Sequence, residues 1–199
     1  MSLLSILASQ HHQGRICIKA NMEKQPAIFL DRDDTLNIDV NYTHQIADFA
    51  WVTGAPEALR AFQMAGLDVF IVTNQGGIGR GLFSEAEMHA FNDHLCAAAK
   101  MAGGAIKDIA FCPHHPEAVT RSLKTPCDYR KPGPGMILDL AEKWSLDLAQ
   151  SIMIGDRQSD VDAGMAAGRH AYLFDGADLA TLARHVITTH FPERARGLV

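Results

Sequence analysis

The feature that most constrains the fold is an alternation of short apolar runs with longer segments of helical periodicity. Five apolar runs are typical of strands, at 27–30, 67–72, 106–111, 151–154 and 171–174. They are apolar along nearly their whole length, which is typical of parallel strands buried on both faces. The pattern therefore predicts an α/β domain built on a doubly wound, Rossmann-like parallel sheet.

Helices are expected between these strands, at 56–65, from Ser84 onward, at 137–144 and at 160–167. The second is the best defined. Ser84 is followed three residues later by Glu87, the spacing of a capping box. Apolar residues then recur at helical spacing as far as Ala102. The sequence thus predicts four helices that cover the two faces of the sheet.

Composition narrows the functional classes. The 199 residues are 47% hydrophobic and carry a net charge of −5, which indicates a globular chain without a basic surface for nucleic acid. No run reaches the ~18 apolar residues of a membrane span. The four cysteines, too few and too irregular for a disulfide scaffold, are Cys17, Cys96, Cys112 and Cys127. We therefore expect a cytoplasmic protein with neither nucleic-acid nor membrane partners. We also expect a monomer, because a short loop is the only cap that the sequence offers.

The domain boundaries follow from the same pattern. Residues 1–22 show no periodicity and are expected to be a disordered N-terminal extension. Residues 23–199 are expected to form a single domain. Within it, residues 112–134 form a proline-rich loop insert that is long for a passive connection.

Polar residues gather where the predicted strands end. Asp31 and Asp33 follow the first strand, Thr73 follows the second, and Asp156 follows the fourth. Lys131 comes at the end of the long loop. The carboxyl ends of parallel strands share one edge, where carboxylates can bind Mg²⁺ and a hydroxyl and a lysine can bind phosphate. A solvated acidic loop would explain Asp31 and Asp33 alone, and a plain turn would explain the segment at Thr73, but the combination favours metal-assisted phosphoryl transfer.

These motifs resemble, in their order, those of the haloacid dehalogenase superfamily of phosphatases. The matching residues are Asp31-x-Asp33-x-Thr35, Thr73, Lys131 and Gly155-Asp156-x-x-x-Asp160, and the resemblance spans 27–174. One branch is closer still, the D-glycero-D-manno-heptose-1,7-bisphosphate 7-phosphatases. Its resemblance rests on Ile28-Phe29-Leu30-Asp31-Arg32-Asp33, Thr73-Asn74-Gln75-x-Gly77-Ile78-x-Arg80-Gly81, Cys112-Pro113-His114-His115-Pro116 and Arg130-Lys131-Pro132.

The resemblance implies a Mg²⁺-dependent phosphatase that works through an aspartyl-phosphate. Asp31 would be the nucleophile and Asp33 the general acid and base. Mg²⁺ would lie between Asp31, the backbone carbonyl of Asp33 and Asp156, with Asp160 supporting the metal site or Lys131. The implied reaction removes the 7-phosphate of a heptose bisphosphate, a small phosphorylated sugar, in ADP-heptose and lipopolysaccharide synthesis. The implied substrate contacts are Thr73, Asn74, Arg80, Arg130, Lys131 and Arg157.

Cys112, His114 and Cys127 resemble a zinc-stabilised loop of the same branch, which would act as a minimal cap. The pattern in that branch ends in Cys-x-Cys, whereas Tyr129 occupies the position of the fourth ligand here. A structural Zn²⁺ normally has four protein ligands, so His115, Asp128 or a water would have to complete the set, or the loop packs without metal. Two other positions differ from the family. Asp34 replaces a usual glycine, and Arg157 replaces a lysine that is frequent in this branch.

Three other functions are open. A histidinol-phosphate phosphatase has similar motifs, but the spacing between its histidine and its cysteine pair is shorter. A receiver-like signalling module also uses paired aspartates, a threonine and a lysine, yet its lysine comes last, whereas Asp156 follows Lys131 here. A non-catalytic relative would explain the unusual Asp34 and Tyr129.

Overall fold

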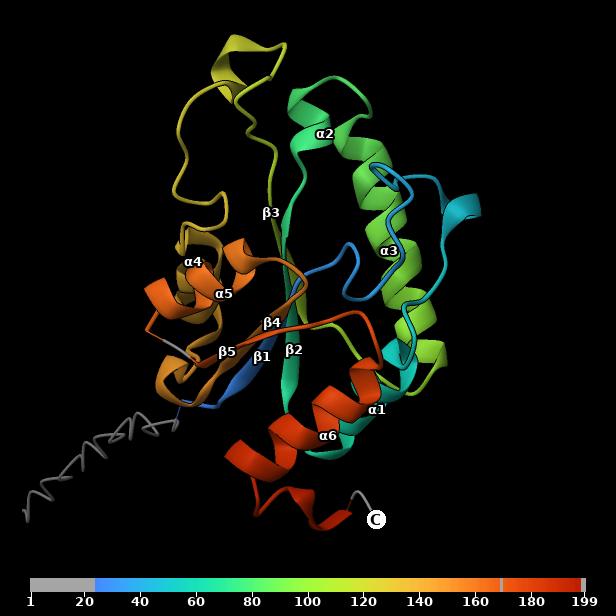
Figure 1. Cartoon of the computed structure of the whole chain (residues 1–199), viewed down its shortest axis with the longest axis vertical. Helices are drawn as coiled ribbons and strands as arrows, with labels where there is room; N and C mark the ends of the chain where they lie inside the picture. Colours follow the sequence, from blue (N-terminus) through green and yellow to red (C-terminus); the bar gives the residue numbers. More distant parts are fainter. Residues whose placement is uncertain (1–23, 169, 198–199) are drawn as a thin grey trace, which may run out of the picture.

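A computed structural model describes residues 24–168 and 170–197, so the predicted extension 1–22 lies outside the described residues. The described chain forms a five-stranded, wholly parallel sheet with the order β3-β2-β1-β4-β5 (Figure 1). The strands are β1 (Ala27–Leu30), β2 (Asp68–Asn74), β3 (Asp108–Cys112), β4 (Ile152–Gly155) and β5 (His170–Leu173). The predicted doubly wound α/β sheet is confirmed.

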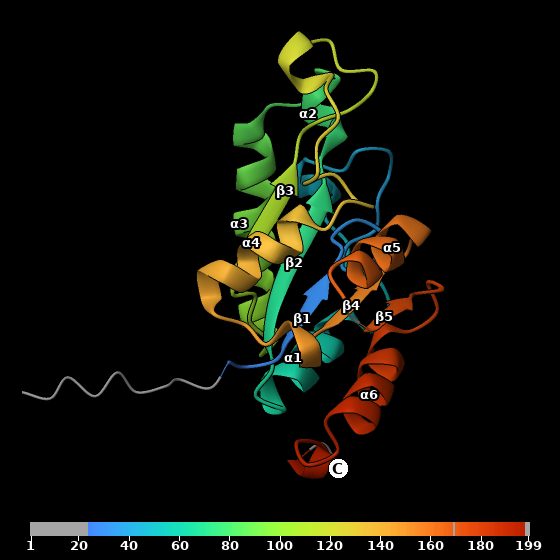
Figure 2. The ribbon, with the colours of Figure 1, turned by 90° about the vertical axis from the view of Figure 1, so that its left-hand side faces the viewer.

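The strand boundaries differ from the prediction mainly at β2. Thr73 and Asn74 are the last two residues of this strand rather than the first residues after it, because they pair in register with Phe111 and Cys112 of β3. The extra length carries the end of β2 beyond that of β1 on the same edge of the sheet (Figure 2).

The four helices predicted between the strands are confirmed, and the described residues form two more, which makes six α-helices. They are α1 (Ala55–Met64), α2 (Gly76–Gly79), α3 (Glu85–Met101), α4 (Gly135–Trp144), α5 (Gln158–Ala166) and α6 (Leu179–His190). Helix α2 is too short to show a period. The buried residues of α6 recur at helical spacing and pack against α1, so this helix has a clear apolar stripe that the sequence analysis did not use. Short 3₁₀ helices lie at Ile46–Asp48, Arg121–Leu123, Leu148–Gln150 and Ala195–Gly197.

The core has two layers, because alternate residues of each strand point to opposite faces of the sheet. Ile28 and Leu30 of β1 pack with buried residues of α1, α3 and α6. Ala27 and Phe29 pack on the other face with buried residues of α4 and α5 (Figure 2). None of the helices in the described part of the chain combines the length and apolar character that a membrane span requires.

Strand β1 lies at the point where the strand order reverses. Its neighbours are β2 on one side and β4 on the other. The backbone N–H of Asp31, just past β1, donates to the carbonyl of Ile154 in β4 at 3.0 Å. The residues that follow β1 and β4 are therefore held next to each other at the carboxyl edge, where ligands of such sheets bind.

Candidate active site

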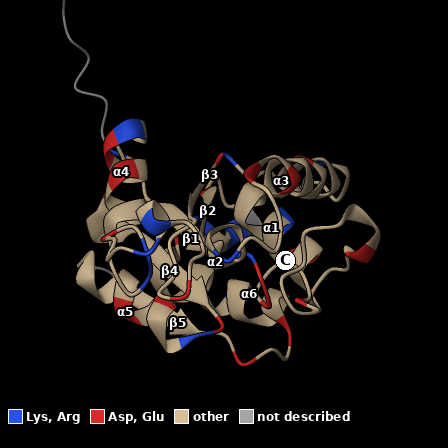
Figure 3. Cartoon of the chain, turned by 90° about the horizontal axis from the view of Figure 1, so that it is seen from above, with Lys and Arg blue, Asp and Glu red and all other residues tan. Residues whose placement is uncertain are grey.

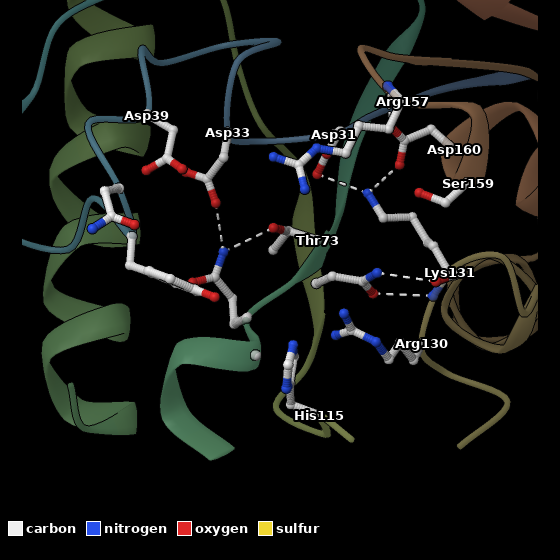
Figure 4. Close-up of a pocket in the computed structure, with 15 residues that line it drawn as sticks. Asp31, Asp33, Asp39, Thr73, His115, Arg130, Lys131, Arg157, Ser159 and Asp160 are labelled. Atoms are coloured by element: carbon white, nitrogen blue, oxygen red, sulfur yellow. Dashed lines mark hydrogen bonds and ion pairs between the residues drawn. The ribbon is translucent and has the colours of Figure 1, made fainter. Parts of the chain in front are cut away.

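A cavity of about 430 Å³ opens at the carboxyl edge of the sheet. It is polar, and Figure 4 shows side chains from several strand ends and from the long loop converging on it. Seen from above, basic and acidic segments both lie close to β1, β2 and β4 (Figure 3). The lining residues are Asp31, Asp33, Asp39, Asn41, Tyr42, Thr73, Asn74, Gln75, Gly76, His115, Arg130, Lys131, Arg157, Ser159 and Asp160.

Lys131 is the central cation of this cavity, and its side chain is 2% exposed. Its Nζ lies 2.8 Å from Asp31 Oδ1 and 2.6 Å from Asp160 Oδ1 (Figure 4). It also donates to the carbonyl of Val72 at 2.8 Å. Burial alone would lower the pKa of Lys131, but the Asp31 and Asp160 carboxylates raise it above its usual value. The lysine is therefore charged at neutral pH, and the expected contact between Asp160 and Lys131 is present.

Asp31 is the carboxylate nearest to the end of β1. Its Oδ1 accepts from the backbone N–H of Arg32 at 2.7 Å as well as from Lys131. Burial raises the pKa of Asp31, while the Lys131 ammonium opposes this effect. The Lys131 ammonium thus favours the ionised form of a carboxylate whose burial disfavours it.

Asp33 is held by side chains from three segments. It receives two hydrogen bonds from Arg32, through Nε and Nη2 at 3.0 Å each. Asn37 Nδ2 donates to it at 3.1 Å and Gln75 Nε2 at 2.8 Å. Gln75 Nε2 also donates to Thr73 Oγ1 at 2.9 Å, so one amide connects Asp33 with Thr73 (Figure 4). Burial raises the pKa of Asp33, and Arg32 opposes the shift.

Three carboxylates form a group that fits a hard divalent cation. One oxygen each of Asp31, Asp156 and Asp160 lies within 4.8 Å of the others. Burial, together with the charges of Asp31 and Asp160, raises the pKa of Asp156 to about 6. An all-oxygen donor set with this excess of negative charge suits Mg²⁺ rather than a soft metal. The expected contribution of the Asp33 carbonyl stays a prediction.

The remaining residues predicted to bind substrate differ in their placement. Asn74 lines the cavity and also fixes the loop, because it exchanges two hydrogen bonds with the backbone of Lys131, at 3.0 and 3.1 Å. Arg130 lines the cavity and donates to the carbonyl of His114 at 2.9 Å. Arg157 also lines it, with its Nε 3.5 Å from Asp156 Oδ2.

Arg80 lies outside the set of residues that line the cavity. It hydrogen-bonds the hydroxyl of Tyr42, which does line the cavity, and its guanidinium carbon lies 5.4 Å from the centroid of that ring. On its other side it pairs with Glu117 at 3.5 Å. A direct substrate contact from Arg80 therefore stays a prediction, and the structure gives it a role in holding Tyr42.

The long loop brings Cys112, His114 and Cys127 together, with donor atoms within 4.8 Å of one another. Cys112 Sγ and His114 Nδ1 are 3.5 Å apart. Burial raises the pKa of Cys112 to about 11, and the nearby Cys127 adds to the shift. Among the described residues no fourth His, Cys, Asp or Glu joins this group. The soft donors suit Zn²⁺, although they supply three ligands rather than four.

The unusual Asp34 occupies a backbone conformation that favours glycine. Its φ is 58°, in the left-handed region. Its carboxylate accepts from the backbone N–H of Asp39 at 2.9 Å, and its own N–H donates to the carbonyl of Asn37 at 2.7 Å. Aspartate is one of the few side chains that visit this region, because it can hydrogen-bond locally. The turn after Asp33 is thus formed without the usual glycine.

Sequence reasoning gave no role to several buried polar residues that line the cavity or lie behind it. Arg32 is 1% exposed, although an arginine between two aspartates is normally solvated. Gln75, Asn37 and Asn92 are also buried. Of these residues, Asn92 alone could have been recognised as buried from the sequence, because it falls on the apolar face of the helix predicted from Ser84 onward.

Comparisons with known proteins place this chain in a family. A family model described as HAD-hydrolase-like matches residues 128–185. A D-glycero-beta-D-manno-heptose-1,7-bisphosphate 7-phosphatase from Rhodopseudomonas palustris is 40% identical over 168 residues, which cover 84% of this chain and 93% of the relative. The chain belongs to the heptose-bisphosphate phosphatase family of HAD-like hydrolases.

Members of this family differ in the anomer that they are named for. A D-glycero-alpha-D-manno-heptose-1,7-bisphosphate 7-phosphatase from Photorhabdus laumondii is 41% identical over 140 residues, covering 70% of this chain and 76% of the relative. A solved heptose-bisphosphate phosphatase from B. bronchiseptica, complexed with magnesium and phosphate, is similar in fold. It has a TM-score of 0.72 and 29% identity, and the match covers 82% of this chain and 99% of that one.

Proposed function

We propose that this chain is a Mg²⁺-dependent phosphomonoester hydrolase that removes the 7-phosphate of D-glycero-D-manno-heptose 1,7-bisphosphate. The observation that carries the proposal is the convergence of Asp31, Thr73, Lys131 and Asp160 on one polar cavity. The relatives named for this activity support the substrate. The same proposal includes a role in ADP-heptose and lipopolysaccharide synthesis and a monomer in the cytoplasm.

In the proposed reaction, Asp31 attacks the phosphorus and forms an aspartyl-phosphate. Its Oδ1 already contacts Lys131 and the Arg32 N–H, so we assign the attack to Oδ2. Lys131 and Thr73 bind oxygens of the transferring group, and the ammonium offsets the repulsion between the carboxylate and the phosphate. Asp31, Asp156 and the backbone carbonyl of Asp33 would hold Mg²⁺, and Asp160 would support the site through its contact with Lys131. The ion would provide further charge neutralisation.

Asp33 completes the proposed reaction as the acid and base. It protonates the leaving sugar alkoxide and then takes a proton from the water that hydrolyses the aspartyl-phosphate. Each step uses the same carboxyl group, so its orientation has to serve the leaving group first and the water second. The hydrogen bonds from Arg32, Asn37 and Gln75 supply that orientation.

The substrate is tested by phosphate release with Mg²⁺ from both anomers of the heptose bisphosphate and from histidinol phosphate. We expect the highest kcat/KM on a heptose bisphosphate, with the 7-phosphate leaving, as followed by ³¹P NMR. Faster cleavage of histidinol phosphate would contradict the substrate but keep the phosphatase. A stable phosphorylated protein without turnover would favour the receiver-like alternative, and no phosphorylation at all would favour a non-catalytic relative.

The nucleophile is tested by Asp31→Asn, which keeps the size of the side chain and removes its charge. We expect kcat to fall at least ~1,000-fold, because no neighbouring group can replace the attacking oxygen. Asp139→Asn, on the exposed side of α4, is the matched control and should retain full activity. Persistent Mg²⁺-dependent activity in Asp31→Asn would show that the nucleophile is assigned wrongly.

We also propose that the long loop holds a structural Zn²⁺ through Cys112, His114 and Cys127. The loop also carries Arg130, whose backbone N–H donates to the Cys127 carbonyl at 3.0 Å, so order in the loop supports the substrate end of the cavity. A solvent molecule is the fourth ligand in this proposal. The loop thereby acts as a small cap.

Zinc content by mass spectrometry tests this site. We expect about one Zn²⁺ per chain, loss of the metal in Cys127→Ser, and a higher KM with little change in kcat. Tyr129→Cys should tighten zinc binding, measured by competition with a chromogenic chelator, because it offers a fourth thiolate. If removal of the metal from the wild-type protein left KM unchanged, the result would contradict the proposal.

A further inference from the structure

Asn92 is the polar residue on the buried face of α3. It is 4% exposed and lies one turn after Met88, on the face that also carries Phe91, Leu95 and Ala99. A buried amide without hydrogen bonds destabilises a fold, so an apolar residue would suit this position better. The partners of Asn92 therefore indicate what the amide does.

The strong partner of Asn92 is Arg32. Asn92 Oδ1 accepts a hydrogen bond from Arg32 Nη1 at 3.0 Å, whereas Nδ2 reaches only the weakly accepting sulfur of Met88. The ring of Phe91 lies against the same guanidinium, 4.8 Å from centroid to Cζ. Two adjacent residues of α3 thus fix the position and the plane of the Arg32 side chain.

The other edge of the guanidinium faces the reaction centre. Its Nε and Nη2 donate to the two oxygens of Asp33, each at 3.0 Å. Nη2 also lies within 3.1 Å of the Thr43 carbonyl and of Gln75 Oε1. A guanidinium presents its N–H groups in a rigid planar fork, so the plane of Arg32 sets the plane of the Asp33 carboxylate.

We propose that Asn92 is a positioning residue for the phosphatase reaction, which orients the acid and base Asp33 through Arg32. The proposal rests on the proposed function, in which Asp33 gives a proton to the leaving alkoxide. Loss of the acceptor at residue 92 lets the guanidinium rotate, and the carboxylate rotates with it. Small errors in the placement of a reacting group reduce rates by up to ~100-fold.

The first test compares Asn92→Leu with Asn92→Asp. Leucine matches the apolar face but offers no acceptor, whereas aspartate keeps an oxygen at the same place. We expect kcat/KM on the sugar phosphate to fall about 10-fold or more in Asn92→Leu and to stay within about 3-fold of wild type in Asn92→Asp. Asn92→Met is a second acceptor-free variant. A packing role predicts the reverse order, because leucine would be tolerated and a buried carboxylate would not.

The second readout is the dependence on the leaving group. 4-Nitrophenolate leaves without a proton, so kcat/KM on 4-nitrophenyl phosphate should fall less than about 3-fold in Asn92→Leu. Equal losses on the two substrates, or none on either, would overturn the proposal while leaving the phosphatase in place. Leu95→Ala, on the same face of α3, is the control. It should lower stability without changing the ratio of kcat/KM on the sugar phosphate to kcat/KM on 4-nitrophenyl phosphate. A wild-type chain inactive on both would overturn the proposed function and this inference together.

Discussion

At the scale of single residues, the sequence predicts the polar groups that line the cavity but not the groups that hold them. Asp31, Thr73 and Lys131 could be predicted because their chemistry and order are typical of phosphoryl transfer. Arg32 could not, because nothing local distinguishes a buried arginine from a solvated one. Its burial depends on acceptors that lie 43 and 60 residues away, on Gln75 and Asn92.

The closeness of Asp31, Asp156 and Asp160 makes the stability of the fold depend on pH, and this dependence can be measured. The pKa of Asp156 is raised from 3.8 to about 6, so the folded state keeps a proton that the unfolded state has lost. This contribution to stability is present below pH 3.8 and is lost as the pH rises to about 6. At pH 7.5 without metal, Asp156→Asn should therefore raise the melting temperature, and the gain should vanish near pH 4.

Magnesium should reverse the destabilisation that the ionised Asp156 causes at pH 7.5. We expect Mg²⁺ to raise the melting temperature of the wild-type chain, because it binds the folded carboxylates, and to have little effect on Asp156→Asn. Asp139→Asn is the control, and it should respond to Mg²⁺ as the wild type does. Equal stabilisation of wild type and Asp156→Asn by Mg²⁺ would show that Asp156 is not a ligand.

At the scale of elements, local signals predicted some boundaries well. The capping box of α3 is present, since Ser84 Oγ accepts from the Glu87 N–H at 3.2 Å and the Glu87 carboxylate accepts from the Ser84 N–H at 2.7 Å. Helix α6 was missed although its buried residues recur at helical spacing, at Leu179, Ala183, Val186 and Ile187. The end of β2 was also missed, because pairing with β3 sets it.

The cap of α3 should contribute to stability and not to catalysis. Ser84→Ala should lower the free energy of unfolding by about 1 kcal/mol, because it removes the acceptor for the first turn of the helix. Urea denaturation measures this change, and kcat/KM should stay at the wild-type value. Ser122→Ala, at an exposed serine of the long loop, should change stability by less than about 0.5 kcal/mol. A loss of activity in Ser84→Ala at full stability would contradict this separation.

At the scale of the whole molecule, the order of strands turns distant sequence motifs into one site. Because β1 lies between β2 and β4, residues 31, 73 and 156 follow or end three adjacent strands. The long loop adds Lys131 from outside the sheet, tied to β2 by Asn74. The sequence predicted this shared edge from the parallel sheet alone. The path of the loop depends on contacts that only the folded chain makes.

The central claim is that this shared edge places one phosphoryl group on Asp31. The direct measurement is rapid acid quenching during turnover of the heptose bisphosphate with Mg²⁺, followed by borohydride reduction and peptide mass spectrometry. Reduction converts an aspartyl-phosphate to homoserine. The account predicts homoserine at position 31, and none in the quenched sample without substrate. Homoserine at another aspartate, or none at all while phosphate is being released, would contradict it.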